Sequence, residues 1–356
     1  MESNQTPQKQ RYIVASPDKD EINRSYAPSR TSAYFDLLNS AYTGNLDDFK
    51  TIAARYDNRG DGLAATIQRL KDRLGRGSLA LAAAGGSVNV CRYLLEELNV
   101  DVDEKDHHGG TPLCYGAVKG HLNSVEYLLE KGANPNGSND PNSTFNAPLH
   151  YAVLGGDIKI QMLLLSKGVR INFVTSSGTA LYYAAVFDQL DSVKLLLDHH
   201  ADPNVVLLGL DTPLIASILN VSPQITDLLL QAGADPNAES RGRCPLRYAV
   251  DYGLTQFVVP LLEGGADPNA TDNVRIPNRG MTAVEIAAKE GKSEIVEILF
   301  PVTSCIPTYP NWTNGGLMEH VHSEADRKKK LQYLSYTIDE LAFICNYCDN
   351  LALEFL

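Results

Sequence analysis

The stretch that decides the fold runs from Thr111 to Asn136 and reads TPLCYGAVKGHLNSVEYLLEKGANPN. The Thr-Pro-Leu at 111–113 starts a short helix, because proline at the first helical position lacks only an N–H that the helix does not use. The Gly-His pair at 120–121 ends that helix. Apolar residues at helical spacing follow within 125–129, and the turn residues of 132–136 end the second helix. The stretch therefore predicts two short antiparallel helices joined by tight turns.

This pattern recurs along most of the chain. The position held by Thr111, which we call the slot opener, recurs at intervals of 32 to 38 residues, at Gly77, Thr111, Ala147, Thr179, Thr212, Cys244 and Thr282. A period near 33 with this pattern resembles the ankyrin repeat, which is a β-turn plus two helices. We expect an all-α ankyrin-repeat solenoid of seven repeats, built from helix–turn–helix units with β-hairpin-like loops.

Turn residues recur at fixed places in each unit. One set of glycines lies nine residues after the slot opener, at Gly86, Gly120, Gly156, Gly253 and Gly291, and another follows the second helix, at Gly132, Gly168, Gly233 and Gly265. Glycine tolerates positive φ, so both sets predict chain reversals. The Asp-Pro-Asn triplets at 202–204, 235–237 and 267–269 predict the turn into the next hairpin.

Composition divides the chain into five segments. Residues 1–31 are polar, without apolar periodicity, and predict a disordered N-terminal tail. Residues 32–76 predict a capping helix pair plus an inserted helix, because terminal repeats are atypical. The repeat array covers 77–300, a Pro/Trp linker with a basic end covers 301–330, and residues 331–356 predict an amphipathic helix or a disordered tail.

The residues of the first full repeat and of the linker are more specific than those of a generic ankyrin unit. The linker carries Phe300-Pro301, Ile306-Pro307, Trp312 and Gly315-Gly316-Leu317. It resembles that of plant proteins that join an ankyrin array to tetratricopeptide repeats, the ankyrin–tetratricopeptide (ankyrin-1-like) family, over roughly residues 35–330. The tetratricopeptide pattern is not found in 331–356. The resemblance thus implies a plant intracellular protein in a short form that lacks the tetratricopeptide half.

Net charge and cysteine usage limit the classes of partner and the cellular compartment that the sequence favours. The chain has 356 residues and a net charge of −12, which disfavours nonspecific binding to nucleic acids or anionic membranes. Without an apolar run of 18 residues or a signal region, we expect neither membrane insertion nor secretion. The six cysteines are scattered, as is typical of reduced thiols in a cytosolic or nuclear protein. We expect a monomer located in the cytoplasm or nucleus.

Candidate binding residues follow from the repeat register. Solenoids bind partners on an extended concave surface, and aromatic and arginine side chains most often dominate binding energy. Hairpin tips and first-helix ends give His107, His108, Lys119, Ser143, Thr144, Phe187, Arg241, Arg243, Tyr252, Asn278, Arg279 and Lys289. The alternative interpretation is a solvated rim with occasional apolar residues.

Other polar residues do not predict chemistry. His150 lies just after the slot leucine, where the ankyrin resemblance implies a structural histidine that hydrogen-bonds between neighbouring turns. The Cys345–Cys348 pair, with His320 and His322 upstream, could bind zinc only if all four converged. Apolar residues around the pair suggest an amphipathic helix instead. We expect no metal, no cofactor and no catalytic site, because no nucleotide-binding, hydrolase, metalloprotease or kinase motif is present.

The sequence therefore favours a non-catalytic adaptor or scaffold that binds a partner protein on the concave ankyrin surface. The alternative is a regulatory or targeting arm of a chaperone-type or signalling complex. In that case the activity would lie in the missing tetratricopeptide domain or in a partner subunit.

Overall fold

The structure is a computed structural model of the whole chain. It describes residues 34–57, 60, 62–138, 147–175, 177–205, 209–271, 280–305, 313 and 317. The predicted tails at 1–31 and 331–356 lie outside the described residues.

Short helices alternate along the described chain. The N-terminal part contains α2 (Phe35–Thr43), α3 (Leu46–Tyr56) and α4 (Leu63–Arg69). The repeats follow as α5 (Ser78–Ala84) and α6 (Val88–Arg92), which a π-helical turn η1 (Tyr93–Glu97) extends, then α7 (Pro112–Val118), α8 (Leu122–Glu130), α9 (Pro148–Leu154), α10 (Ile158–Ser166), α11 (Ala180–Val186), α12 (Leu190–Asp198), α13 (Pro213–Leu219), α14 (Pro223–Gln231), α15 (Pro245–Asp251), α16 (Thr255–Glu263), α17 (Ala283–Lys289) and α18 (Ser293–Leu299).

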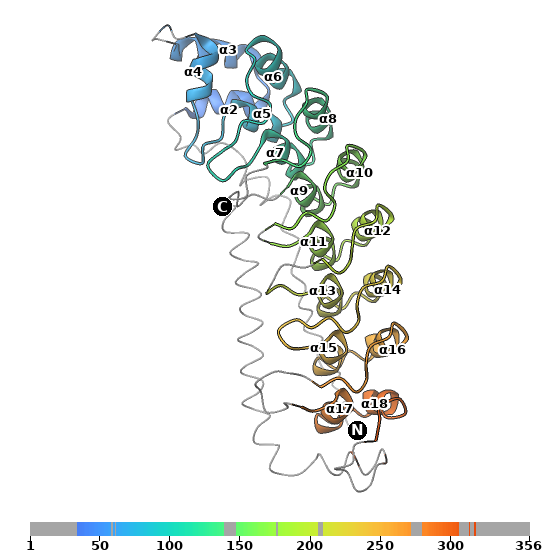
Figure 1. Cartoon of the computed structure of the whole chain (residues 1–356). Coiled ribbons are helices and arrows are strands. Elements are labelled where there is room, and N and C mark those ends of the chain that lie inside the picture. Colours follow the sequence, from blue (N-terminus) through green and yellow to red (C-terminus); the bar gives the residue numbers. More distant parts are fainter. Residues whose placement is uncertain are drawn as a thin grey trace, which may run out of the picture.

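The helices form two layers that run the length of the array (Figure 1). First helices contact first helices, from α5 through α7, α9, α11, α13 and α15 to α17, and second helices contact one another from α6 to α18 in the same order. Apolar side chains of both layers form one continuous core. Because each repeat buries its apolar face against the next, the chain builds a solenoid rather than a closed globule. The predicted all-α ankyrin fold is confirmed.

The Thr-Pro-Leu motif starts the first helices as expected. Proline occupies the first turn of α7, α9, α13 and α15. At two of the openers threonine also caps the helix: Thr179 Oγ1 accepts from the Tyr182 N–H at 3.1 Å, and Thr212 Oγ1 accepts from the Ile215 N–H at 3.1 Å. These side chains satisfy donors that the first helical turn leaves unpaired.

The residue nine positions after the slot opener has a positive φ in every repeat. The five predicted glycines have φ between 65° and 73°. Two repeats lack glycine there, yet Asp188 and Val221 adopt φ of 53° and 57°. Positive φ is unfavourable for a β-branched side chain, so the stacked repeats impose the turn even where the sequence resists it.

A ladder of asparagine side chains joins successive repeats. Asn204 Oδ1 accepts from the Asp235 N–H at 2.8 Å, and Asn237 Oδ1 accepts from the Asp267 N–H at 2.8 Å. Four further rungs have the same form, in which Asn136, Asn172, Asn269 or Asp103 accepts from a backbone N–H of the following unit. The Asp-Pro-Asn turn therefore fixes the register between repeats as well as reversing the chain.

The hairpin loops lie on the inside of the curve of the array, next to the first helices (Figure 1). Isolated antiparallel bridges close three of them, Thr175–Gly178, Ser240–Arg243 and Thr271–Thr282. These bridges are the β-hairpin-like feature expected from the sequence. The inner side of the array, formed by first helices and hairpins, is the concave face that positions the candidate site.

Candidate functional site on the concave face

The predicted hairpin residues lie at the rim of the concave face. His107 and His108 are exposed in the loop before α7, and Arg241 is exposed in the loop before α15. The first loop is held firmly, because Asp106 Oδ1 accepts from the N–H groups of His108 and Gly110, both at 2.8 Å. Such a loop presents its side chains with little ordering cost on binding. Ser143, Thr144, Asn278 and Arg279 lie outside the described residues.

A row of buried tyrosines lies on the first helices, beneath the hairpins. Tyr115, Tyr151, Tyr183 and Tyr248 each lie four residues after a slot opener, on α7, α9, α11 and α15, and we call them the aromatic row. The Tyr115 hydroxyl donates to Asp106 Oδ2 in its own hairpin, and the Tyr248 hydroxyl donates to the Ser240 carbonyl at 3.4 Å. These bonds show that the ring lies on the hairpin side of its helix. The row was not predicted, although the constant offset of its members from the slot opener signals it.

Two predicted aromatic residues extend this row. Phe187 and Tyr252 end α11 and α15 and are partly buried. The Phe187 ring lies 5.8 Å from that of Tyr183, and the Tyr252 ring stacks on that of Tyr248 at 6.5 Å. The structure thus brings both predicted residues against buried tyrosines that were not among the predicted ones.

Guanidinium groups lie over both ends of the row. Arg76 is 5.9 Å from the Tyr115 ring centroid, and Arg243 is 5.9 Å from that of Tyr248. A cation over an aromatic face is attracted by the ring quadrupole. Burial, together with the charge of Asp211, raises the pKa of Tyr248 above its usual value, so that this residue stays a neutral donor.

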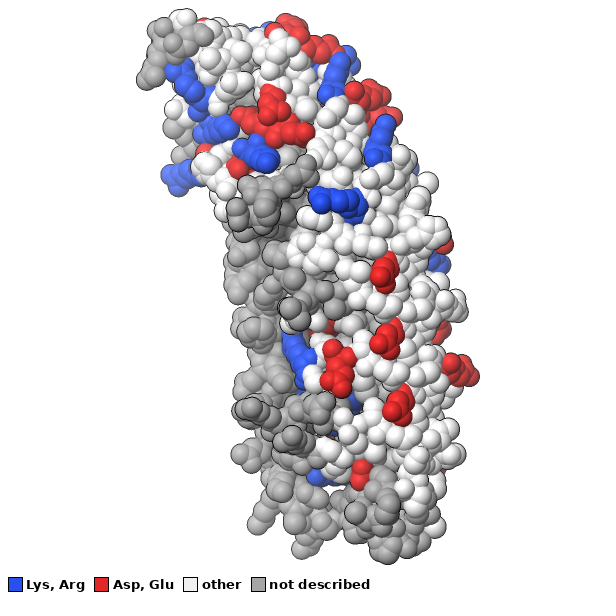
Figure 2. Space-filling model, in the orientation of Figure 1, with Lys and Arg blue, Asp and Glu red and all other residues white. Residues whose placement is uncertain are grey.

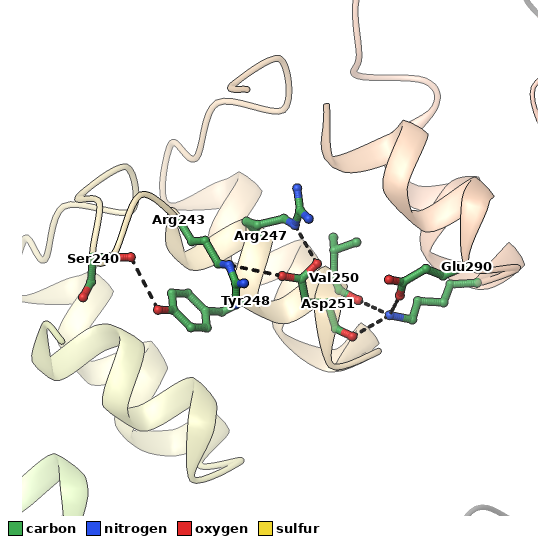
Figure 3. Close-up of polar contacts among 8 residues, drawn as sticks. Ser240, Arg243, Arg247, Tyr248, Val250, Asp251 and Glu290 are labelled. Carbon is green, nitrogen blue, oxygen red and sulfur yellow. Dashed lines mark hydrogen bonds and ion pairs between the residues drawn. The ribbon is translucent and has the colours of Figure 1, made fainter. Parts of the chain in front are cut away.

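Arg243 does not have the surface position expected for it. Its residue exposure is 4%, and its Nε lies 3.8 Å from Asp251 Oδ2 (Figure 3). Arg247 Nε donates to Asp251 Oδ1 at 2.6 Å. We call Arg243, Arg247 and Asp251 the arginine cluster. One carboxylate faces two guanidinium groups at the C-terminal end of the aromatic row.

The end of α15 beside this cluster is capped by the next repeat. Lys292 Nζ donates to the carbonyls of Val250 at 2.5 Å and Asp251 at 2.7 Å, and it also contacts Glu290. A cation at the C-terminal carbonyls of a helix is favourable because of the helix dipole. Lys292 therefore fixes α15 relative to α17, and with it the direction of Tyr252 and Asp251.

The two predicted lysines lie at first-helix ends. Lys119 follows α7 and is partly buried, with Nζ 6.0 Å from the Tyr42 ring centroid, and burial lowers its pKa to about 8. Lys289 is the last residue of α17 and is partly buried. Neither lies within the arginine cluster.

His150 has the structural place implied by the ankyrin resemblance. It is 1% exposed, and its Nε2 lies 3.2 Å from the carbonyl of Gly178 in the next hairpin. Burial lowers its pKa to about 4. A neutral imidazole that links α9 to the following hairpin explains this residue without a metal. Within the described ranges no group of His, Cys, Asp and Glu side chains could hold a metal ion, and His320, His322, Cys345 and Cys348 lie outside those ranges.

Charged side chains do not form a continuous stripe on the face shown in Figure 2. Basic groups gather mostly over the N-terminal repeats of that view, mixed with acidic ones, whereas acidic and uncharged groups dominate the later repeats. Polyanion binding would require a basic stripe along the array.

Comparison with known proteins agrees with this architecture. A family model described as ankyrin repeats in three copies matches residues 37–139 and 137–206, and a single ankyrin-repeat model matches 241–273. The chain belongs to the ankyrin-repeat family. Among solved structures, this ankyrin-repeat chain is similar to the human ASB11 ankyrin repeat domain, with a TM-score of 0.54 and 29% identity over 65% of this chain and 98% of that one.

Curated relatives share only the repeats. Over 154 residues the chain is 39% identical to the ankyrin repeat protein L371 of Acanthamoeba polyphaga mimivirus, covering 42% of this chain and 20% of that protein. Over 137 residues it is 34% identical to the transient receptor potential channel pyrexia of Drosophila melanogaster, covering 38% of this chain and 14% of the channel. The chain thus spans a fifth or less of these relatives. Among the described residues, no helix has the length and apolar character needed to span a membrane.

Proposed function

We propose that this ankyrin-repeat chain is an adaptor or scaffold that binds a partner protein on its concave face and performs no catalysis. Ankyrin repeats are in general modules of protein–protein interaction. The observation that carries the proposal is the pair of partly buried rings, Phe187 and Tyr252, at the edge of the buried aromatic row. Aromatic and arginine side chains held by rigid elements are the usual centres of binding energy.

The geometry favours one kind of partner. Phe187 and Tyr252 supply partly buried ring surface beside the row, and Arg241 supplies an exposed positive charge in the hairpin before α15. A segment that carries apolar side chains along one face and carboxylates on its other face would bury the former and pair the latter. The partner segment is therefore acidic and amphipathic.

Affinity capture with matched variants tests this proposal. The bait is the full chain, and the test variant is Phe187→Ala/Tyr252→Ala. Met162→Ala is the control, because Met162 is 55% exposed on α10 in the outer layer. Captured proteins are then purified and titrated against each bait. We expect the double variant to bind at least tenfold more weakly, while the control matches the unchanged chain. Equal affinity of a folded double variant would refute the concave-face assignment.

A second role remains compatible with the comparisons. The matched relatives are several times longer than the region they share with this chain, so the array could serve as the targeting arm of a larger chaperone-type or signalling assembly. Membership of the plant ankyrin–tetratricopeptide family, a cytoplasmic or nuclear location and a monomeric state all stay predictions. Isolation of the endogenous protein, followed by native mass measurement of its complexes, distinguishes a free adaptor from a stable subunit.

A further inference from the structure

Two hairpins at the N-terminal end of the array present their turns side by side. Arg73 and Leu74 form the turn before α5, and His107 and His108 form the turn before α7. We call these four residues the N-terminal tips. The His107 N–H donates to the Leu74 carbonyl at 2.9 Å, and the His107 ring lies over Gly75, where an added Cβ would be 2.5 Å from it. The two turns therefore form one continuous surface.

Internal contacts hold both turns in place. Asp72 Oδ1 accepts from the N–H groups of Leu74 and Arg76, both at 2.9 Å, which repeats the contacts described above for the loop before α7. Lys71 Nζ lies 2.9 Å from Glu104 Oε1 and so joins one hairpin to the other. Side chains on turns that are already ordered lose little conformational entropy when they bind a ligand.

One large apolar side chain is exposed at the tips. Four such residues are at least 44% exposed within the described ranges, namely Leu74, Met162, Val259 and Val302. Met162 and Val259 lie on α10 and α16 in the outer layer, and Val302 follows α18. Leu74 is thus the one of the four that lies in a hairpin, on the side of the molecule where the concave face is.

Arg73 gives the tips an exposed positive charge. The buried carboxylates of Asp72 and Asp106 accept hydrogen bonds inside their own hairpins. Glu104 is paired with Lys71. The Arg73 guanidinium is exposed and makes no hydrogen bond or ion pair within the part of the chain that the structure describes. Because a guanidinium matches a carboxylate through two parallel hydrogen bonds, the tips favour an acidic ligand.

We propose that the N-terminal tips are a separate small site for a short acidic motif of a partner protein, in which a carboxylate and an apolar side chain lie next to each other. The carboxylate pairs with Arg73, and the apolar side chain covers Leu74, which removes both apolar surfaces from water. This inference rests on the proposed function, since the tips lie at the rim of the same face. It adds a site that involves neither Phe187 nor Tyr252.

Nuclear magnetic resonance titration of the full, isotope-labelled chain tests the inference with a synthetic peptide, Gly-Ser-Asp-Phe-Glu-Ser-Gly. We expect saturable shifts of the Leu74 and His108 amide signals. A second peptide with Asn and Gln in place of the two acids, and a third with Ser in place of Phe, should each bind at least fivefold more weakly. Equal binding of all three peptides, or shifts confined to other parts of the chain, overturns the inference.

A charge exchange sharpens the test. Arg73→Glu should bind the acidic peptide at least fivefold more weakly, and it should bind a peptide with lysines in place of the acids more tightly than the unchanged chain does. Leu74→Ser should remove the preference for Phe over Ser. Lys194→Glu is the control, because it makes the same charge change at an exposed position on α12 in the outer layer. A control as weak as Arg73→Glu would overturn the inference, since net charge alone would then explain the attraction.

Partner capture separates this inference from the proposed function. If the peptide binds the tips but Phe187→Ala/Tyr252→Ala leaves the affinity for a captured partner unchanged, the inference stands and the concave-face assignment fails. If the peptide does not bind while the double variant loses a captured partner, the adaptor function stands and the inference fails. If both hold, Arg73→Glu should also weaken binding of the captured partner, whereas Lys194→Glu should not.

Discussion

The Asn237 side-chain oxygen accepts a hydrogen bond from the Asp267 N–H of the next repeat at 2.8 Å, while its amide nitrogen donates to the Gly265 carbonyl at 2.9 Å. One side chain thus joins the turn of its own repeat to two backbone groups of the following one. Asn204 does the same with Asp235 and Gly233. The ladder is a directional connection between units, independent of the apolar core beneath it.

Replacement of a rung should weaken the array. We expect Asn237→Ala to lower the free energy of unfolding by about 1 kcal/mol, because a typical net contribution per hydrogen bond is of that size. Urea unfolding followed by circular dichroism measures the change. Asn123→Ala on the exposed side of α8 serves as the control and should leave stability unchanged or slightly raised, because alanine favours helix. A control as destabilised as Asn237→Ala would contradict the role of the ladder.

Relief of the unfavourable turn at Val221 should stabilise the protein. A left-handed conformation costs a non-glycine residue about 1–2 kcal/mol. Glycine removes this strain, but it loses more conformational entropy on folding, which costs about 0.5–1 kcal/mol. We therefore expect Val221→Gly to raise the free energy of unfolding by about 0.5–1 kcal/mol, seen as a higher melting temperature. The reciprocal change Gly253→Val, at the equivalent position with φ 65°, should lower it. A lower free energy of unfolding for Val221→Gly would contradict this expectation, because the loss of side-chain packing would then exceed the strain that the substitution relieves.

Buried neutral His150 should make the array sensitive to acid. Its pKa of about 4 in the folded chain lies below the value of 6.5 for an unperturbed histidine. Between these values the unfolded chain binds a proton that the folded chain does not, so stability falls as pH falls from 6.5 towards 4. The loss is on the order of 3 kcal/mol. Unfolding free energies measured across this range for His150→Gln should decline less steeply than those of the unchanged chain.

Parallel pH profiles for the two chains would contradict this account. Carboxylates titrate in both, so only the difference between the profiles reports on His150. Glutamine retains an N–H donor for the Gly178 carbonyl, which keeps the link between α9 and that hairpin.

Removal of the carboxylate from the arginine cluster should be costly. In Asp251→Ala the buried guanidinium groups of Arg243 and Arg247 no longer have Asp251 between them, and loss of one partner from a buried ion pair typically costs about 3 kcal/mol. We expect chemical denaturation to show a loss of that order. The double variant Arg247→Met/Asp251→Ala should recover part of it, because one buried charge is removed along with its partner. An exposed pair gives the contrast: Arg92→Gln, which loses the contact with Glu96, should change stability much less.

The fold was predictable because the repeat signal is carried by residues with few alternatives. Thr-Pro-Leu starts helices by its chemistry, and glycine at the reversals marks a conformation that other residues avoid. The structure extends this signal to Val221 and Asp188, which adopt the same φ without being glycine. No local pattern could reveal those two, since the neighbouring repeats impose their conformation.

The candidate site was less accessible from the sequence. Phe187 and Tyr252 were found from residue type and register, and both adjoin the aromatic row. Arg243 was selected by the same rule and proved to be buried against Asp251. Its partner lies in the following helix, and a position on the repeat template does not show which side chain it meets. The four tyrosines were not predicted as site residues, and they are indeed buried members of the core.

The ladder has one further consequence. In each rung a side-chain oxygen of an asparagine or aspartate in one unit accepts a hydrogen bond from a backbone N–H of the next unit. The bond requires only these two groups. Excision of a whole unit between two equivalent turns would leave each remaining side chain facing a suitable donor. The array can therefore be shortened or lengthened by complete units, which changes the reach of its groove in single steps.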